Sequence, residues 1–418
     1  MSKLKLTLIS MGAVAALVGI GGYAYSQYNN PQTEFARNEI NQLDKLNKYI
    51  DVRAKISKDY GKKAEDKSQR LEFKHDLFSL DLYKDGLEKH SAVRGKGNFI
   101  GKTVDILAVE KDDKLNVDMN FYKKVLEVPN KLLTKQAKQL TGDNKGQGEE
   151  DIALNDFVES FFFLSKKNPY NFTDKQIKEI YKSVDKTAFH KNGHTITLTL
   201  NKDNLVKITE KVKEVVNKNS KDNKFNQATL DNLIKQAKEA KGDVVITQMK
   251  ISDETLNRII NWSNHKVEIN STVNSDGFSV EVNEQNIEVG FRSEKQGDKF
   301  KDIFLITSKA NDKKVTQSRI ELNSDKVSDT EYKIDGYSRQ YNSGIQDIKK
   351  VKGYVKTYDK SLELKLEMER ADSIFVKYSY DTALPKVDAS KEVTKVNEDN
   401  IDKVMQEIQL SIAEFIKN

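Results

Sequence analysis

One stretch of the chain comes close to a phosphate-binding loop: the run from Gly95 to Thr103, GKGNFIGKT. Such a loop needs four residues between its first glycine and the Gly-Lys-Thr, so that successive backbone N–H groups wrap the phosphates. Gly97 is one residue too close to that triplet, and Gly95 is one residue too far. The residues after Thr103 read as a strand, whereas the loop must lead into a helix. We therefore interpret these glycines as hairpin glycines.

Two histidines, His190 and His194, lie four residues apart. On a helix this spacing directs both side chains at one metal ion. Asn192-Gly193 interrupts any helix here, and no H-E-x-x-H pattern is present, so we interpret both as turn histidines. The other histidines are isolated in sequence, which leaves a spatial cluster open: His75, His90 and His265.

Other catalytic patterns are missing from the sequence. The acidic run Glu149-Glu150-Asp151 reads as a solvated loop, and no spacing indicates two carboxyls facing each other across a cleft, as a glycosidase requires. There is no G-x-S-x-G nucleophile motif. The chain has no Cys, which excludes disulfides, thiolate metal sites, Cys nucleophiles and acylated cysteine anchors. We therefore predict a protein that is not an enzyme and carries no cofactor or metal.

An aromatic segment is the strongest candidate for a binding site. Phe157, Phe161 and Leu164 lie on one face of a predicted helix, while Phe162 and Phe163 point elsewhere. A helix that is apolar on more than one side must be covered by protein, lipid or ligand. One interpretation is a helix sandwiched between a sheet and a neighbouring element. The other makes these five residues the lining of an apolar groove that binds a ligand.

Composition limits the partners of the protein. Charged residues make up 32% of the chain and hydrophobic residues 37%, which predicts a modest core under a highly charged surface. The net charge of +6 is a small difference between 70 basic and 64 acidic residues. A nucleic-acid surface needs its basic residues concentrated on one face, so this mixture argues against nucleic acid. Weak attraction to anionic lipid or wall polymer stays open.

The elements that must position any site follow from hydrophobic periodicity. We expect a helix over 33–60, followed by an antiparallel meander from Arg70 to Phe121, where apolar and polar residues alternate. Thr173 begins a capping box, and Ser252 is expected to cap a short helix that runs through Trp262. Further helices are expected over 132–140, 152–164, 173–184, 202–216 and 227–241, strands over 194–200, 243–251 and most of 267–380, and an amphipathic helix over 401–416.

The N-terminal run Leu6 to Tyr25 is long enough to span a bilayer as a helix. Lys3 and Lys5 precede it, so we expect a cytoplasmic N-terminus, a single pass through the plasma membrane and an extracytoplasmic main domain. A cleavable signal peptide ending near Ala24-Tyr25-Ser26 is the alternative. The run exceeds the usual length of a signal core, which favours the retained anchor.

These elements predict an α+β protein: an N-terminal transmembrane helix followed by a large curved antiparallel sheet with helices gathered on one face. The predicted domains are residues 1–28 (cytoplasmic start and anchor), 29–68 (helical juxtamembrane segment), 69–385 (sheet domain with helices inserted at 129–262) and 386–418 (linker and amphipathic helix). No repeat of fixed period is present, and the strand-rich thirds could form one sheet or two.

The basic start and anchor (Lys3 to Tyr25), the meander (Leu71 to Phe121) and the terminal helix (Ile401 to Ile416) resemble uncharacterised single-pass extracytoplasmic proteins of Gram-positive bacteria. The plan of a sheet with helices is also similar to lipid carriers of the LolA and mycobacterial lipoprotein type, in layout only. The resemblance implies a membrane-anchored binding protein that holds a lipid or other apolar ligand between sheet and helices. A structural or scaffolding cell-envelope protein, bound to a protein or wall polymer, is the alternative.

Overall fold

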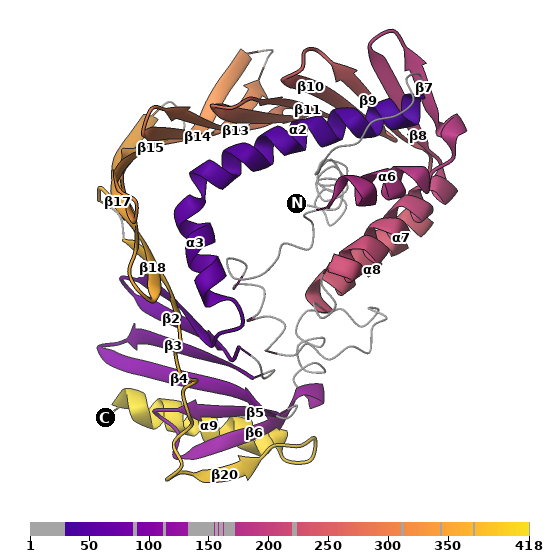
Figure 1. The fold of residues 1–418 in the computed structure, drawn as a ribbon. Coiled ribbons are helices and arrows are strands. Elements are labelled where there is room, and N and C mark those ends of the chain that lie inside the picture. The colour runs from indigo at the N-terminus through magenta and orange to yellow at the C-terminus, as the bar shows by residue number, and fades with distance from the viewer. Residues whose placement is uncertain are drawn as a thin grey trace. The chain divides into compact units, whose positions relative to one another are not determined.

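A computed structural model describes residues 30–86, 90–111, 114–132, 154, 158, 162, 172–219, 224–310, 313–342, 345–370 and 373–417. Its strands belong to one large, open, mixed sheet of 20 strands, and its helices are few (Figure 1). The chain divides into two compact units. Unit 1 comprises Met1–Lys55, Lys167–Val327 and Tyr332–Lys352, and unit 2 comprises Ile56–Lys166, Ser328–Glu331 and Gly353–Asn418.

The strands of unit 1 form an antiparallel ladder. They are β7 (Phe189–Asn192), β8 (Thr195–Leu200), β9 (Val244–Lys250), β10 (Thr255–Trp262), β11 (His265–Val273), β12 (Gly277–Glu284), β13 (Ile287–Gln296), β14 (Lys299–Ala310), most of β15 (Lys313–Ser328) and β16 (Glu331–Asn342), and the first part of β17 (Ile345–Thr357). From β7 to β15 each strand pairs with the next along the chain. Short connections join most of these antiparallel neighbours, whereas helices over 202–219 and 224–239 lie between β8 and β9 in the chain.

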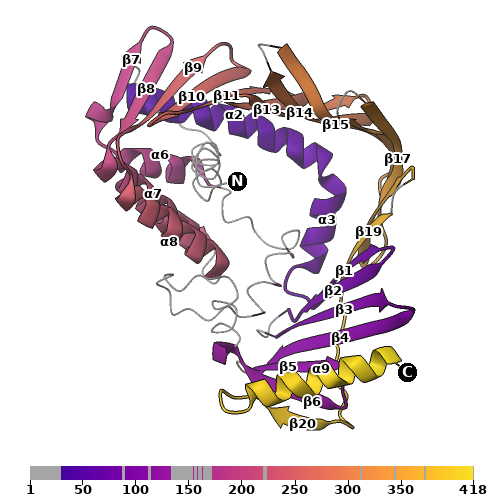
Figure 2. The ribbon, with the colours of Figure 1, turned by 180° about the vertical axis from the view of Figure 1, so that it is seen from behind.

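Helices cover one face of this ladder. They are α2 (Pro31–Arg53), α6 (Asp174–Lys182), α7 (Lys202–Asn219) and α8 (Lys224–Glu239), with the short 3-10 helix η2 (Lys186–Ala188) before β7. Figures 1 and 2 both show α2 running along the sheet and α7 beside α8. Apolar residues of these helices, such as Phe35, Ile177 and Val215, are buried in one cluster with Leu198 and Ile246 of the strands. The main core of unit 1 therefore lies between these helices and β7 to β12.

Unit 2 brings early and late parts of the chain together. Its elements are α3 (Lys55–Ala64), β1 (Gln69–His75), β2 (Phe78–Lys84), β3 (Ser91–Phe99), β4 (Lys102–Lys111), β5 (Lys114–Met119), β6 (Lys124–Pro129), the end of β17 (Ile345–Thr357), β18 (Ser361–Met368), β19 (Ile374–Tyr380), β20 (Glu392–Lys395) and α9 (Ile401–Lys417). Strand β1 pairs with β2 and also with the late strand β19. Strands β2 to β6 continue as an antiparallel meander, and β20 joins β6 in parallel.

The predicted fold class is wrong, because the sheet is mixed rather than antiparallel. The physical reason is the short strand β20. Its four residues, Glu392–Lys395, lie in a stretch that we read as a linker after Pro385, because a segment so short carries no clear alternation. Pairing with β6 satisfies its backbone hydrogen bonds and adds the parallel register.

The predicted transmembrane helix at Leu6 to Tyr25 lies outside the described residues. Within the part of the chain that the structure describes, no helix combines the length and the apolar character needed to cross a membrane. This finding contradicts the transmembrane element of the predicted fold and the predicted single-pass localisation at the plasma membrane.

Two local predictions also need correction. The predicted helix from Ser252 to Trp262 is the strand β10, in which the apolar spacing of Leu256, Ile259 and Ile260 imitates a helical face. Its partners β9 and β11 on both sides decide in favour of a strand. The helix predicted over 33–60 is two helices, since α2 ends at its C-cap Ala54 and α3 follows.

Candidate functional site

The candidate site lies on one face of the unit 2 sheet. Residues directly opposite each other on antiparallel strands point to the same face. Gln69, Lys84, Ser91 and Glu110 are such successive partners on β1, β2, β3 and β4. All four are buried. We call these four residues the polar row.

The polar row is held at its two ends. The side-chain amide of Gln69 donates to the carbonyl oxygen of Ala64 at 2.8 Å, and the amide of Asn130 donates to Glu110 Oε1 at 2.6 Å. Between them, Ser91 Oγ has no hydrogen-bond partner among the described residues. A buried hydroxyl without a partner costs folding free energy, and an apolar side chain would cost less. Fold stability alone therefore does not account for this serine.

Apolar residues occupy the next two levels of the same face. Leu71, Leu82, Val93 and Ala108 stand beside the polar row, and beyond them come Phe73, Leu80, Gly95 and Ile106. Residues two apart along a strand point to the same face, so these two levels and the polar row all lie on one face of the sheet. The face thus changes from polar to apolar along its strands.

Two glycines leave space in the middle of this face. Among the described residues, a Cβ atom added at Gly95 would meet no heavy atom within 4 Å. One added at Gly97 would meet only ordinary contacts, with Leu77 O at 3.6 Å and Phe78 Cβ at 3.8 Å. Neither glycine has a positive φ, and glycine inside a strand lowers stability. Neither backbone geometry nor packing requires them. We call the strip above Gly95 and Gly97 the glycine lane.

Other elements border the lane on the same face. Phe162 and Val158 are fully buried in one cluster with Leu71 and Leu82. The ring of Phe162 stands edge-on to Tyr378, with 6.5 Å between ring centroids, and Lys84 Nζ lies 5.7 Å from the Phe162 centroid. Burial raises the pKa of the Tyr378 hydroxyl to about 12, so this tyrosine is neutral at pH 7. Phe162 therefore connects the polar row to the apolar cluster.

Helix α9 packs on the far side of the lane. Val404 of α9 is buried in a cluster with Met119 and Leu126, which share the face through the pairing of β4, β5 and β6. Glu407 accepts hydrogen bonds from the Tyr122 hydroxyl at 2.9 Å and from Lys124 at 3.2 Å. The lane thus lies between the Phe162 cluster and α9 within unit 2.

The sequence predicted Phe157, Phe161, Phe162, Phe163 and Leu164 as ligand-binding residues. Only Phe162 belongs to the described residues, and it is buried at the edge of the lane. The other four lie outside them. Whether these rings bind a ligand stays a prediction.

The remaining sequence candidates have structural positions. The run Gly95 to Thr103 is the hairpin β3–β4, as predicted. His190 lies in β7 and His194 in the turn to β8, so they do not share a helix face. Among the described residues, no group of three or more His, Asp, Glu or Cys side chains is placed to hold a metal ion.

A second polar cluster lies in unit 1, between α2 and the sheet. The Glu39 carboxylate accepts hydrogen bonds from Arg258 Nε and Nη2 and from Gln248 Nε2, at 2.5 to 2.7 Å. Gln248 in turn accepts from Asn38, and Arg258 donates to Ser271. These groups are buried and joined to one another, so the cluster fixes α2 on the sheet and leaves no exposed reactive group.

Sequence reasoning missed the polar row. Lys84, Ser91 and Glu110 each stand at a strand end, where polar residues are usual, so nothing marked them. The available signal was the presence of two glycines, Gly95 and Gly97, two positions apart inside a strand. Glycines in a strand often mark a place where a ligand or another backbone approaches closely.

A comparison with protein-family models found no match to this chain, and a search of curated proteins found no matching relative.

Proposed function

We propose that this protein binds an amphiphilic ligand, a lipid, on the glycine lane of unit 2, without catalysing a reaction. The lane supplies what each part of such a molecule requires. Its apolar levels suit an acyl chain, and the polar row at their end suits a head group. Binding sites of this kind are mostly apolar, with a few polar groups that fix orientation.

The observation that carries the proposal is the open space at Gly95. Leu80 and Ile106 flank it on the neighbouring strands, and Ile106 is still 37% exposed although it belongs to this apolar face. Space at the centre of an apolar surface is unfavourable in a folded chain unless another apolar group fills it. A ligand chain lying along the lane supplies those contacts.

The polar row favours an anionic head group. Lys84 brings a positive charge to the end of the apolar levels, and the Ser91 hydroxyl lies on the next strand. A positive charge at the end of an apolar surface favours a ligand that carries a carboxylate or phosphate there. We therefore expect a preference for anionic over neutral lipids.

The lane can be filled by mutation in the full-length chain. Gly95→Val adds a side chain where no atom of a described residue lies within 4 Å of the added Cβ, so we expect the fold to be at least as stable. Binding of a fluorescent fatty acid should weaken by about tenfold or more, because the added methyl groups occupy the lane. Gly290→Val in β13 of unit 1 is the matched control, because a Cβ there also meets only ordinary contacts.

Head-group recognition is tested with Lys84→Met, which keeps much of the apolar stem and removes the charge. Its affinity for a fatty acid should fall more than its affinity for the corresponding fatty alcohol. Mass spectrometry of gently purified protein should also find co-purified lipid. Absence of lipid, together with equal fatty-acid affinities of the Gly95 and Gly290 variants, would refute the proposal. The scaffolding function, with a protein or wall-polymer partner, would then be favoured.

A further inference from the structure

Two neighbouring hairpins of unit 2 carry exposed apolar residues at their tips. Leu77 and Phe78 are 68% and 47% exposed at the β1–β2 turn, and Phe99 and Ile100 are 53% and 71% exposed at the β3–β4 turn. The Asn98 N–H donates to the Leu77 carbonyl at 3.4 Å, so the two tips lie side by side. Apolar residues gathered on loop tips differ from single exposed residues, which need no explanation.

The turn at the second tip is built from an unfavourable residue. Ile100 has φ +50° and Gly101 has φ +76°, the pattern of a two-residue type I′ hairpin turn. Asn-Gly is preferred there, whereas a β-branched residue at positive φ is strained. The isoleucine side chain is mostly exposed, so packing does not compensate for this strain. The isoleucine at this position therefore favours a role in contacting another molecule.

Basic side chains stand beside the tips. The stretch Arg94 to Lys102 contains three basic residues and no acidic one. Arg94 and Lys96 both pair with the single carboxylate of Asp105, at 2.6 Å and 3.3 Å, which leaves a net positive charge. On the first hairpin, Lys74 is exposed and pairs with Glu72, and the Asp76 carboxylate accepts from the Ser373 hydroxyl. The excess of positive charge therefore lies on the second hairpin, where Arg94, Lys96 and Lys102 outnumber the single carboxylate of Asp105.

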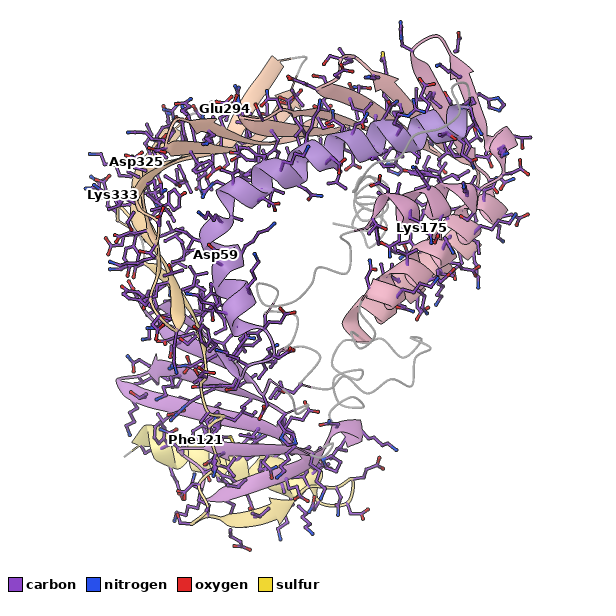
Figure 3. The ribbon with its side chains drawn as sticks, viewed as in Figure 1. Asp59, Phe121, Lys175, Glu294, Asp325 and Lys333 are labelled. Atoms are coloured by element: carbon purple, nitrogen blue, oxygen red, sulfur yellow. The ribbon has the colours of Figure 1, made fainter. Side chains whose placement is uncertain are left out.

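The end of α9 adds to the same edge. Lys102 donates to the carbonyl oxygen of Phe415. The Phe415 ring also contacts the ring of Phe121, which is labelled in Figure 3, with 5.8 Å between centroids. Ile412 and Ile416 are partly exposed on this last part of α9. Apolar side chains thus continue from the hairpin tips to the helix end.

We propose that the hairpin tips 77–78 and 99–100 dock on the surface of an anionic lipid bilayer. Exposed apolar side chains that enter the head-group region and flanking lysines that meet anionic lipids are the two components of peripheral membrane binding. Charge complementarity selects this partner over a neutral surface. The docking does not depend on the proposed lipid site, although the lane leads from the polar row toward these tips.

The protein has no Cys, so one introduced cysteine carries a dye at a single position. In full-length Asn98→Cys, an environment-sensitive dye should shift to the blue with vesicles of phosphatidylcholine and phosphatidylglycerol, and brominated lipids should quench it. A dye in Gln285→Cys, at the β12–β13 turn of unit 1, should do neither. Raising the salt concentration from about 0.05 to 0.5 M should weaken the response severalfold, because salt screens the lysines.

Ile100→Asn separates docking from folding. Asparagine suits the positive φ, so the melting temperature should stay the same or rise, while the vesicle concentration needed for the dye response increases about tenfold. Ile287→Asn, at the first residue of β13 in unit 1, where the side chain is 56% exposed, should leave the response unchanged. Gly95→Val should also leave it unchanged, which distinguishes this test from that of the lipid site. A dye at position 98 that stays in water beside anionic vesicles, or a response that Ile100→Asn does not weaken, would overturn the proposal.

Discussion

In unit 1 the buried carboxylate of Glu39 accepts hydrogen bonds from Arg258 and Gln248, whereas in unit 2 the buried hydroxyl of Ser91 has no partner among the described residues. Both groups lie on a sheet face that helical segments cover. The face in unit 1 is filled by α2, but the face in unit 2 keeps space above Gly95. A satisfied network serves stability, and an incompletely filled face is where a ligand gains most. This difference is the reason that we propose a ligand site in unit 2.

The largest expected effect is on the satisfied network. Arg258→Ala leaves Glu39 buried without its charge partner, so the free energy of unfolding should fall by about 3–5 kcal/mol. Urea denaturation measures this change. Arg292→Ala, which removes an exposed pair with Glu294, is the control and should cost less than about 1 kcal/mol. Equal losses in the two variants would contradict the assignment of the network to stability.

The next effect concerns pH. Burial alone would raise the pKa of Glu321, but hydrogen bonds from Lys301, Arg319 and Tyr337 lower it to about 2. A carboxylate with a depressed pKa stabilises the folded state above its unfolded pKa, here near 4.5, and this stabilisation disappears as the pH falls toward 2. It is on the order of 2–3 kcal/mol.

Glu321→Gln should therefore flatten the dependence of unfolding free energy on pH between about 5 and 2. Equilibrium denaturation of both proteins across this range measures the difference. Parallel curves would show that Glu321 carries no such linkage.

A smaller effect is expected at the border of the lane. Phe162→Leu keeps an apolar side chain in a fully buried position, so the loss should be about 1–1.5 kcal/mol by thermal or urea unfolding. Phe172→Leu is the matched control in unit 1, where the phenylalanine is also buried. A much smaller loss at Phe162 than at Phe172 would indicate that the cover of the lane is loosely packed.

The smallest effect is expected at Ser91, and Ser293 of unit 1 is the buried serine with which it is compared. Ser293 shares a 2.7 Å hydrogen bond with the Tyr49 hydroxyl and also donates to Asp302, so Ser293→Ala should cost about 1–2 kcal/mol. Ser91→Ala removes no observed hydrogen bond and should be neutral or slightly stabilising. Chemical denaturation of the pair gives the answer. A clear loss at Ser91 would reveal a partner and weaken the contrast between the units.

Local patterns were the predictable part of this fold. The alternation from Leu71 to Leu82 is the hairpin β1–β2, HTITLTL contains β8, and the capping box at Thr173 is present at the start of α6. Each depends on residues close together in sequence. Turn glycines were also interpreted correctly, since Gly101 has a positive φ in the β3–β4 turn.

The site and the sheet type depend on residues far apart in sequence. No local signal pairs Lys124 with Glu392 in parallel, and none aligns Lys84, Ser91 and Glu110 across three strands. From the sequence alone, Arg258 in β10 would be expected at the surface. It is buried because its guanidinium group donates to the Glu39 carboxylate. These features depend on the pairing register of strands that are far apart in the chain, and this register cannot be predicted from local patterns in a single sequence.

The pairing of β1 with β19, and of β6 with β20, has a consequence for synthesis on the ribosome. The first strands of unit 2 leave the ribosome long before their partners do, and loop closure over such separations slows folding. Until then β1 and β6 expose unpaired backbone edges to other chains. Most of unit 1 is translated in the interval, so unit 1 has the opportunity to finish folding before unit 2.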